Sequence, residues 1–98
     1  MSTPEAHVTV TDNPEAHQYE IRMDGGVAGF VTYRLHPGRV ELIHTEIRPE
    51  LEGHGLGGRL AAEVLDDIRK RGLSVTPTCP FIKQFIAENE QYADLVAA

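Results

Sequence analysis

The segment EGHGLGGRLAAEVLDDIRKRG, residues 52–72, decides the fold of this chain. It opens with closely spaced glycines and continues with apolar residues at the spacing of one helix face: Leu56, Leu60, Val64 and Ile68, with Ala61 and Leu65 beside them. Charged residues fill most of the remaining positions, cations gather in the last turn, and Gly72 suits the position just past a helix end. The segment therefore predicts a glycine-rich loop that leads directly into an amphipathic helix ending at Arg71.

Four stretches before this loop have the pattern of β-strands, at residues 8–11, 19–23, 27–35 and 40–47. Short turns rich in Asp, Asn, Gly and Pro separate them, and short turns join antiparallel neighbours. A fifth strand, residues 73–78, follows the helix and is expected to run parallel to the fourth, and a second helical stretch begins near Pro80. The predicted class is α+β with an α/β-type final unit: a mixed sheet in which an antiparallel meander of about four strands precedes a βαβ unit, with two or so helices.

The composition is that of one globular domain over residues 1–98. The chain has 98 residues, 41% of them hydrophobic and 24% charged. Its net charge of −6 argues against a nucleic-acid partner, because phosphate binding needs clustered Lys and Arg. The single cysteine, Cys79, excludes an intrachain disulfide and a four-thiolate zinc site, and no histidine pair has metal-ligand spacing, so we expect no metal.

The ends and the apolar runs of the sequence carry no targeting pattern. The first residues, MSTPEAHVTV, lack the basic and apolar regions of a signal peptide. No apolar run approaches the ~20 residues of a membrane helix. We therefore expect a cytoplasmic protein that does not bind a membrane.

The glycine loop has the properties of an anion site. Gly53, Gly55, Gly57 and Gly58 precede the helix, where backbone amides lack intrahelical partners and the helix dipole is positive. The spacing matches the dinucleotide fingerprint, but the next strand ends in PTC without the acidic residue that fingerprint requires. A P-loop is excluded because Arg59 and Leu60 stand where Lys and Ser or Thr are needed. A phosphate or pyrophosphate site remains, with a plain tight turn as the alternative.

The segment IHTEIRPELEGHGLGGRLAAEVLDDIRKRGLSVTPTCPFIKQFIAENEQYADLV resembles the short, single-domain members of the GNAT acetyltransferase superfamily. The resemblance runs from about Val27 to the C-terminus and rests on the pattern HTE, P-ELEG-x-G-x-G, CPF and YADL. It implies acetyl-CoA as the acetyl donor, bound between two splayed parallel strands with its pyrophosphate on the loop. Glu52 departs from the Arg or Gln usual at the loop start and is expected to point away. The implied cofactor-binding residues are Ile47, Gly53, His54, Gly55, Leu56, Gly57 and Gly58. Arg59, in the first turns of the helix, is a further candidate that could meet a CoA phosphate, with a solvent-facing role as the alternative.

Typical members of this superfamily have two helices after the first strand and two further strands at the end of the sheet. These parts build the acceptor pocket, and this chain lacks them. The main hypothesis is an acetyl-CoA-dependent N-acetyltransferase acting on an unidentified amine. The alternatives are a non-catalytic module that binds acetyl-CoA or CoA, and an interaction domain with no ligand. The sequence leaves the oligomeric state open.

Three residues are candidates for catalysis. Cys79 precedes Pro80, a favoured first helical residue, so it is expected to cap the second helix, where free amides favour a reactive thiolate. It is a candidate nucleophile, a candidate proton donor to the leaving thiolate, or a buried apolar residue. His44 and Glu46 share one face of the fourth strand and are candidate bases for the amine, with a core or solvated role as the alternative for each. Tyr92 is a weaker candidate acid, for which core packing is favoured.

Pro77 bears on the cleft between the fourth and fifth strands. Proline has no N–H and cannot complete the ladder between them. The sequence is consistent with a gap that admits the pantetheine arm or with the simple end of a short edge strand.

Overall fold

The computed structural model describes residues 7–96, in which five strands form one sheet in the order β1-β2-β3-β4-β5. The strands are β1 (Val8–Asn13), β2 (Gln18–Met23), β3 (Gly26–His36), β4 (Arg39–Ile47) and β5 (Ser74–Pro77). The first four are antiparallel neighbours, and β5 runs parallel to β4. The predicted meander and parallel final pair are confirmed.

Two α-helices and three 3-10 turns complete the described residues. The helices are α1 (Leu56–Lys70) and α2 (Pro80–Glu88), and the turns are η1 (Pro14–Ala16), η2 (Pro49–Leu51) and η3 (Glu90–Leu95). Helix α1 ends one residue before the predicted position, a difference within the fraying of a helix end. Because α1 links β4 to the parallel β5, these elements form the expected βαβ unit.

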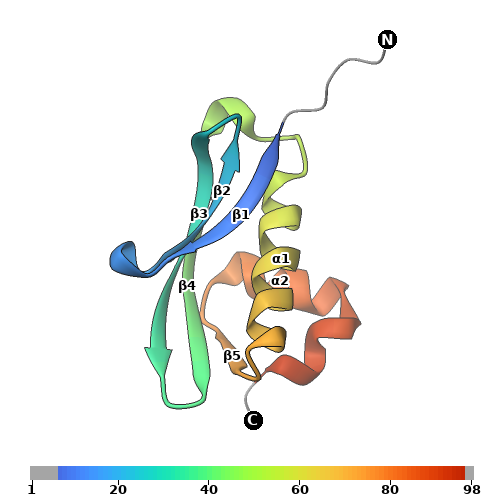
Figure 1. Cartoon of the computed structure of the whole chain (residues 1–98). Helices are drawn as coiled ribbons and strands as arrows, with labels where there is room; N and C mark the ends of the chain where they lie inside the picture. Colours follow the sequence, from blue (N-terminus) through green and yellow to red (C-terminus); the bar gives the residue numbers. More distant parts are fainter. Residues whose placement is uncertain (1–6, 97–98) are drawn as a thin grey trace.

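The hydrophobic core lies between the sheet and the helices, which cover one face of it (Figure 1). All six apolar residues predicted for the inner face of α1 are buried. They pack in one cluster with sheet residues such as Ile21, Val31 and Leu42, and with Ile82 from α2. Within residues 7–96 no helix covers the opposite face, so the molecule has two layers.

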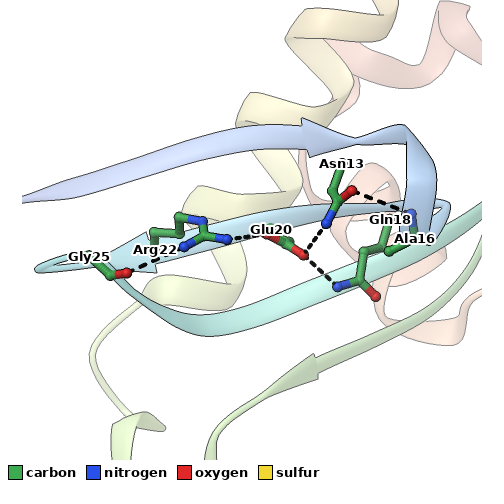
Figure 2. A network of polar contacts seen from close by, with 6 residues as sticks. All are labelled: Asn13, Ala16, Gln18, Glu20, Arg22 and Gly25. Atoms are coloured by element: carbon green, nitrogen blue, oxygen red, sulfur yellow. Dashed lines mark hydrogen bonds and ion pairs between the residues drawn. The ribbon is translucent and has the colours of Figure 1, made fainter.

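The uncovered face carries one deeply buried charge. Glu20 of β2 is only 5% exposed, because polar side chains surround its carboxylate (Figure 2). Asn13 Nδ2 and Gln18 Nε2 donate to Oε2 at 2.9 and 2.8 Å, and Arg22 Nη2 donates to Oε1 at 2.9 Å. These hydrogen bonds hold the pKa of Glu20 below its usual value despite burial. The network ties the β1–β2 hairpin together on the side without helices.

Candidate functional site

The fourth and fifth strands separate at one end of the sheet. Their pairing runs only from Arg39 opposite Ser74 to Leu42 opposite Pro77. The N–H of Cys79 then donates to Leu42 O at 2.8 Å, and the chain turns into α2. Pro77 thus ends a short strand and also marks the point where the β4–β5 ladder opens. The second half of β4 therefore has no strand partner on the side of β5.

An extra residue in β4 sets which way its second half faces. The register with β3 passes from Leu42 opposite Tyr33 to His44 opposite Thr32, so Ile43 has no partner of its own. Such a bulge shifts the alternation of side chains by one residue. Simple alternation from the buried Leu42 would place His44 on the helix-covered face, but the bulge places it on the uncovered face.

The backbone of this half-strand is directed alternately to β3 and to the gap. Just past the end of β4, the N–H of Arg48 donates to the carbonyl oxygen of Ala28 in β3 at 2.8 Å. Alternate residues of an antiparallel strand bond the same neighbour, so Glu46 also bonds to β3. The backbone groups of Thr45 and Ile47 therefore face the open side. Ile47 is one of the implied cofactor-binding residues, and its backbone lies on this open side.

A cavity of about 430 Å³ lies beside the gap. Six of the eight predicted cofactor-binding residues line it, namely Ile47, Gly53, Gly55, Leu56, Gly57 and Gly58. Four more residues line it: Thr45, Leu51, Glu52 and Phe81. Glu52 was expected to point away from the loop, but it is exposed and lines this cavity. The cavity thus joins the free edge of β4 to the start of α1.

The start of α1 gives the cavity its electrostatic character. Gly55 is the N-cap with φ of 74°, in the left-handed region that favours glycine, and no side chain caps the helix. The first amides of α1 therefore remain available to an anion, and the helix dipole adds positive potential. A Cβ on Gly57 would lie 3.0 Å from Phe81 Cζ, so any larger residue here would displace that ring or narrow the cavity.

Cys79 is the N-cap of α2, as predicted, but its thiol is not accessible. The residue is 3% exposed, and its Sγ lies 3.2 Å from Thr45 Oγ1. Thr45 lines the cavity, so it lies between the thiol and the ligand space. Of the three roles considered for Cys79, the buried apolar residue agrees best with this packing.

His44 and Glu46 meet on the uncovered face of the sheet. Their side chains are 59% and 61% exposed, and His44 Nε2 lies 3.3 Å from Glu46 Oε1. The Phe30 ring lies beside His44, with ring centroids 6.3 Å apart. The structure brings the two predicted bases together. It does not bring His44 to Cys79, since the thiol lies on the helix-covered face.

The remaining candidates lie elsewhere. His54 is exposed and does not line the cavity. Arg59 Nε lies 2.8 Å from Glu63 Oε2, and its Nη2 donates to Val8 O at 3.2 Å, which draws it toward β1.

Tyr92 is a core residue, as the sequence favoured. It is 7% exposed and donates to Asp66 Oδ1 at 2.9 Å. Burial and that hydrogen bond raise its pKa. Its hydroxyl is therefore committed to α1 and does not face the cavity.

Thr45, Leu51 and Phe81 are cavity residues that sequence reasoning missed. Phe81 carried a usable signal, because it follows the N-cap and proline of a helix that begins at the strand gap. Thr45 had none, since its direction depends on the bulge.

Residues 7–96 hold neither a metal-ligand cluster nor a membrane-spanning helix. No group of three or more His, Cys, Asp or Glu side chains is placed to hold a metal ion. No helix in the same part of the chain has the length and apolar character needed to cross a bilayer.

Comparison with curated proteins gives relatives of similar length. Protein NATD1 of Xenopus tropicalis is 26% identical over 88 residues, covering 88% of this chain and 81% of the relative. Protein NATD1 of Mus musculus is 27% identical over 84 residues, covering 84% and 76%.

Comparison with solved structures gives the same fold. A GCN5-like protein from Staphylococcus aureus, solved by NMR, has a TM-score of 0.69 at 22% identity and covers 92% of this chain and 88% of that one. The ribosomal-protein-alanine N-acetyltransferase of Brucella melitensis biovar Abortus 2308 has a TM-score of 0.54 at 20% identity, with 83% and 61% covered.

The family model described as GCN5-related N-acetyl-transferase matches residues 18–95. That range contains the strand gap, the glycine loop and both α-helices, so every part of the candidate site lies inside it. The chain belongs to the GCN5-related N-acetyltransferase family.

Proposed function

We propose that this chain is an acetyl-CoA-dependent N-acetyltransferase that transfers the acetyl group directly to an amine. The observation that carries the proposal is the opening of β4 from β5 beside the start of α1, with a cavity joining the two. The free amides of α1 suit a pyrophosphate. The exposed backbone edge at Thr45 and Ile47 suits an amide-rich arm and a thioester carbonyl, which an N–H of β4 would polarise.

The two faces of β4 divide the chemistry between donor and acceptor. The donor occupies the helix-covered side, where Thr45 lines the cavity. The amine approaches from the uncovered face, where Glu46, hydrogen-bonded to His44, accepts the ammonium proton. The amine nitrogen then bonds to the acetyl carbon as the carbon–sulfur bond breaks, and the electron pair of that bond leaves on the CoA sulfur. The nitrogen loses its second proton to solvent, which leaves a neutral amide.

We assign Cys79 to the leaving-group side. Its thiol contacts Thr45 Oγ1, so a proton can reach the departing CoA sulfur through that hydroxyl and be restored from solvent as the products leave. The 3% exposure of Cys79 argues against an acetyl-cysteine intermediate, because the sulfur would have to reach the acetyl carbon past Thr45.

A non-catalytic CoA-binding module is the second candidate. It is favoured by the exposure of Glu46 and His44. The side chain of each is more than half exposed, and no helix within the described residues covers them. An acceptor would have to be positioned without an enclosing wall on that face.

Product analysis separates the two candidates. The protein would be incubated with acetyl-CoA and mixed amines, namely amino acids, polyamines and a lysine-containing peptide. CoA release would be followed with a thiol reagent, and acetylated products by mass spectrometry. Acetylation that Glu46→Gln reduces supports the enzyme, whereas CoA binding in calorimetry without any product supports the binding module. Absence of both would refute the proposal.

A further inference from the structure

We infer that the cavity recognises an acyl donor without using its adenosine 3′-phosphate, and that Glu52 sets this selectivity by repelling phosphate charge. The inference rests on the proposed function. It starts from the side chains that line the cavity. None of the ten is cationic, and one, Glu52, is a carboxylate.

The two arginines that flank the loop in sequence are engaged elsewhere. Arg48, before the loop, forms an ion pair with Glu50. Arg59, after it, bonds to Glu63 and to the carbonyl of Val8 on β1. Recruiting either one to a phosphate would require an existing contact to break.

The remaining cation near the cavity points away from it. Lys83 follows the cavity residue Phe81 by two positions on α2. Successive residues of an α-helix are turned by roughly 100°, so Lys83 projects from nearly the opposite side. Residues 1–6 and 97–98 contain no Lys or Arg.

No cationic side chain lines the cavity, so the groups best placed to hold a phosphate are the backbone amides at the start of α1. Such amides hold one phosphate or pyrophosphate close to the loop, where the dipole acts within about one turn. A further phosphate on the ribose gains no partner from them. It adds negative charge to a ligand whose cavity is lined by Glu52, in a protein whose net charge is −6.

The test compares CoA with dephospho-CoA, which lacks only the 3′-phosphate, by isothermal titration calorimetry at low ionic strength. We expect the wild type to bind dephospho-CoA at least as tightly as CoA. Glu52→Gln should tighten CoA about fivefold, which corresponds to ~1 kcal/mol, and dephospho-CoA by less, because CoA carries more charge. Raising the salt concentration should bring the two wild-type affinities together, since the repulsion is screened.

Glu15→Gln is the matched control. It removes the same charge from the η1 turn, outside the cavity, and should change neither affinity. A wild type that prefers CoA by fivefold or more would overturn the inference and leave the proposed function intact. So would an equal effect of Glu52→Gln and Glu15→Gln. Failure of every variant to bind either ligand would instead overturn the proposed function, and this inference with it.

Discussion

Replacing Gly57 by leucine should close the cavity without unfolding the protein. A Cβ at this position would lie 3.0 Å from the tip of the Phe81 ring, and the rest of the leucine would extend into the space between loop and ring. We expect CoA affinity to fall by about tenfold or more, or ~1.4 kcal/mol. Phe81 is 42% exposed and can turn outward, so the strain in the fold is small.

The effect of this substitution on stability should be small, because two contributions oppose each other. A non-glycine residue in a helix gains about 0.5–1 kcal/mol over glycine, which offsets the cost of moving the Phe81 ring. We therefore expect the free energy of unfolding to change by less than ~1 kcal/mol, or a Tm shift within roughly 4–8 °C. Calorimetric titration with CoA and a thermal melt of the same sample measure both quantities.

Gly58→Ala is the control for Gly57→Leu. Its Cβ would meet Phe85 Cε1 at 3.8 Å, an ordinary contact directed toward α2. It should keep CoA affinity within about twofold and raise the Tm slightly, by the same helix propensity. A folded Gly57→Leu protein with unchanged affinity would refute the assignment of this cavity to the donor. Equal losses in both variants would show that the loop tolerates no side chain, whatever its direction.

Two other substitutions and one alkylation experiment test packing and charge. Glu20→Gln should make the free energy of unfolding less sensitive to acid. Because the pKa of Glu20 is lowered in the folded protein, its carboxylate stabilises the fold above the unfolded pKa of about 4.3. This contribution is lost as the pH falls toward the folded pKa. Urea melts from neutral pH into the acid range would show a shallower decline, and an unchanged slope would contradict the network. Gly29→Ala should destabilise the fold by about 1–3 kcal/mol, because its Cβ would lie 2.5 Å from both Glu46 O and Ile47 Cδ1. A Tm equal to that of the wild type would contradict this and show that β4 can shift away from β3 at little cost. Cys79 in the folded protein should react with iodoacetamide much more slowly than in the urea-unfolded protein, and equal rates would refute its burial.

The fold could be predicted because its patterns are local. The apolar spacing of α1 lies within one segment, and all six predicted inner residues are buried. The hairpins follow from short turns, and the parallel β5 follows from the helix that precedes it. The loop residues of the site were predicted for the same reason, since glycines before a helix have a direct physical meaning.

The directions of the catalytic candidates could not be predicted. Alternation put His44 and Glu46 together, and the structure confirms that they share a face. Which face it is depends on the bulge at Ile43, a property of the pairing between two strands that no single segment reveals. The burial of Cys79 likewise depends on Thr45, which lies 34 positions away in the chain.

The extra residue in β4 is absorbed locally, so the side chains before and after it keep the faces that their pairing with β3 dictates. Removing Ile43 would give a regular ladder, with Leu42 still opposite Tyr33 and His44 still opposite Thr32. His44 and Glu46 would stay on the uncovered face, and Thr45 and Ile47 would stay on the side of the cavity. A variant one residue shorter would thus keep its donor and acceptor sides, and simple alternation along its sequence would give the correct face for each side chain.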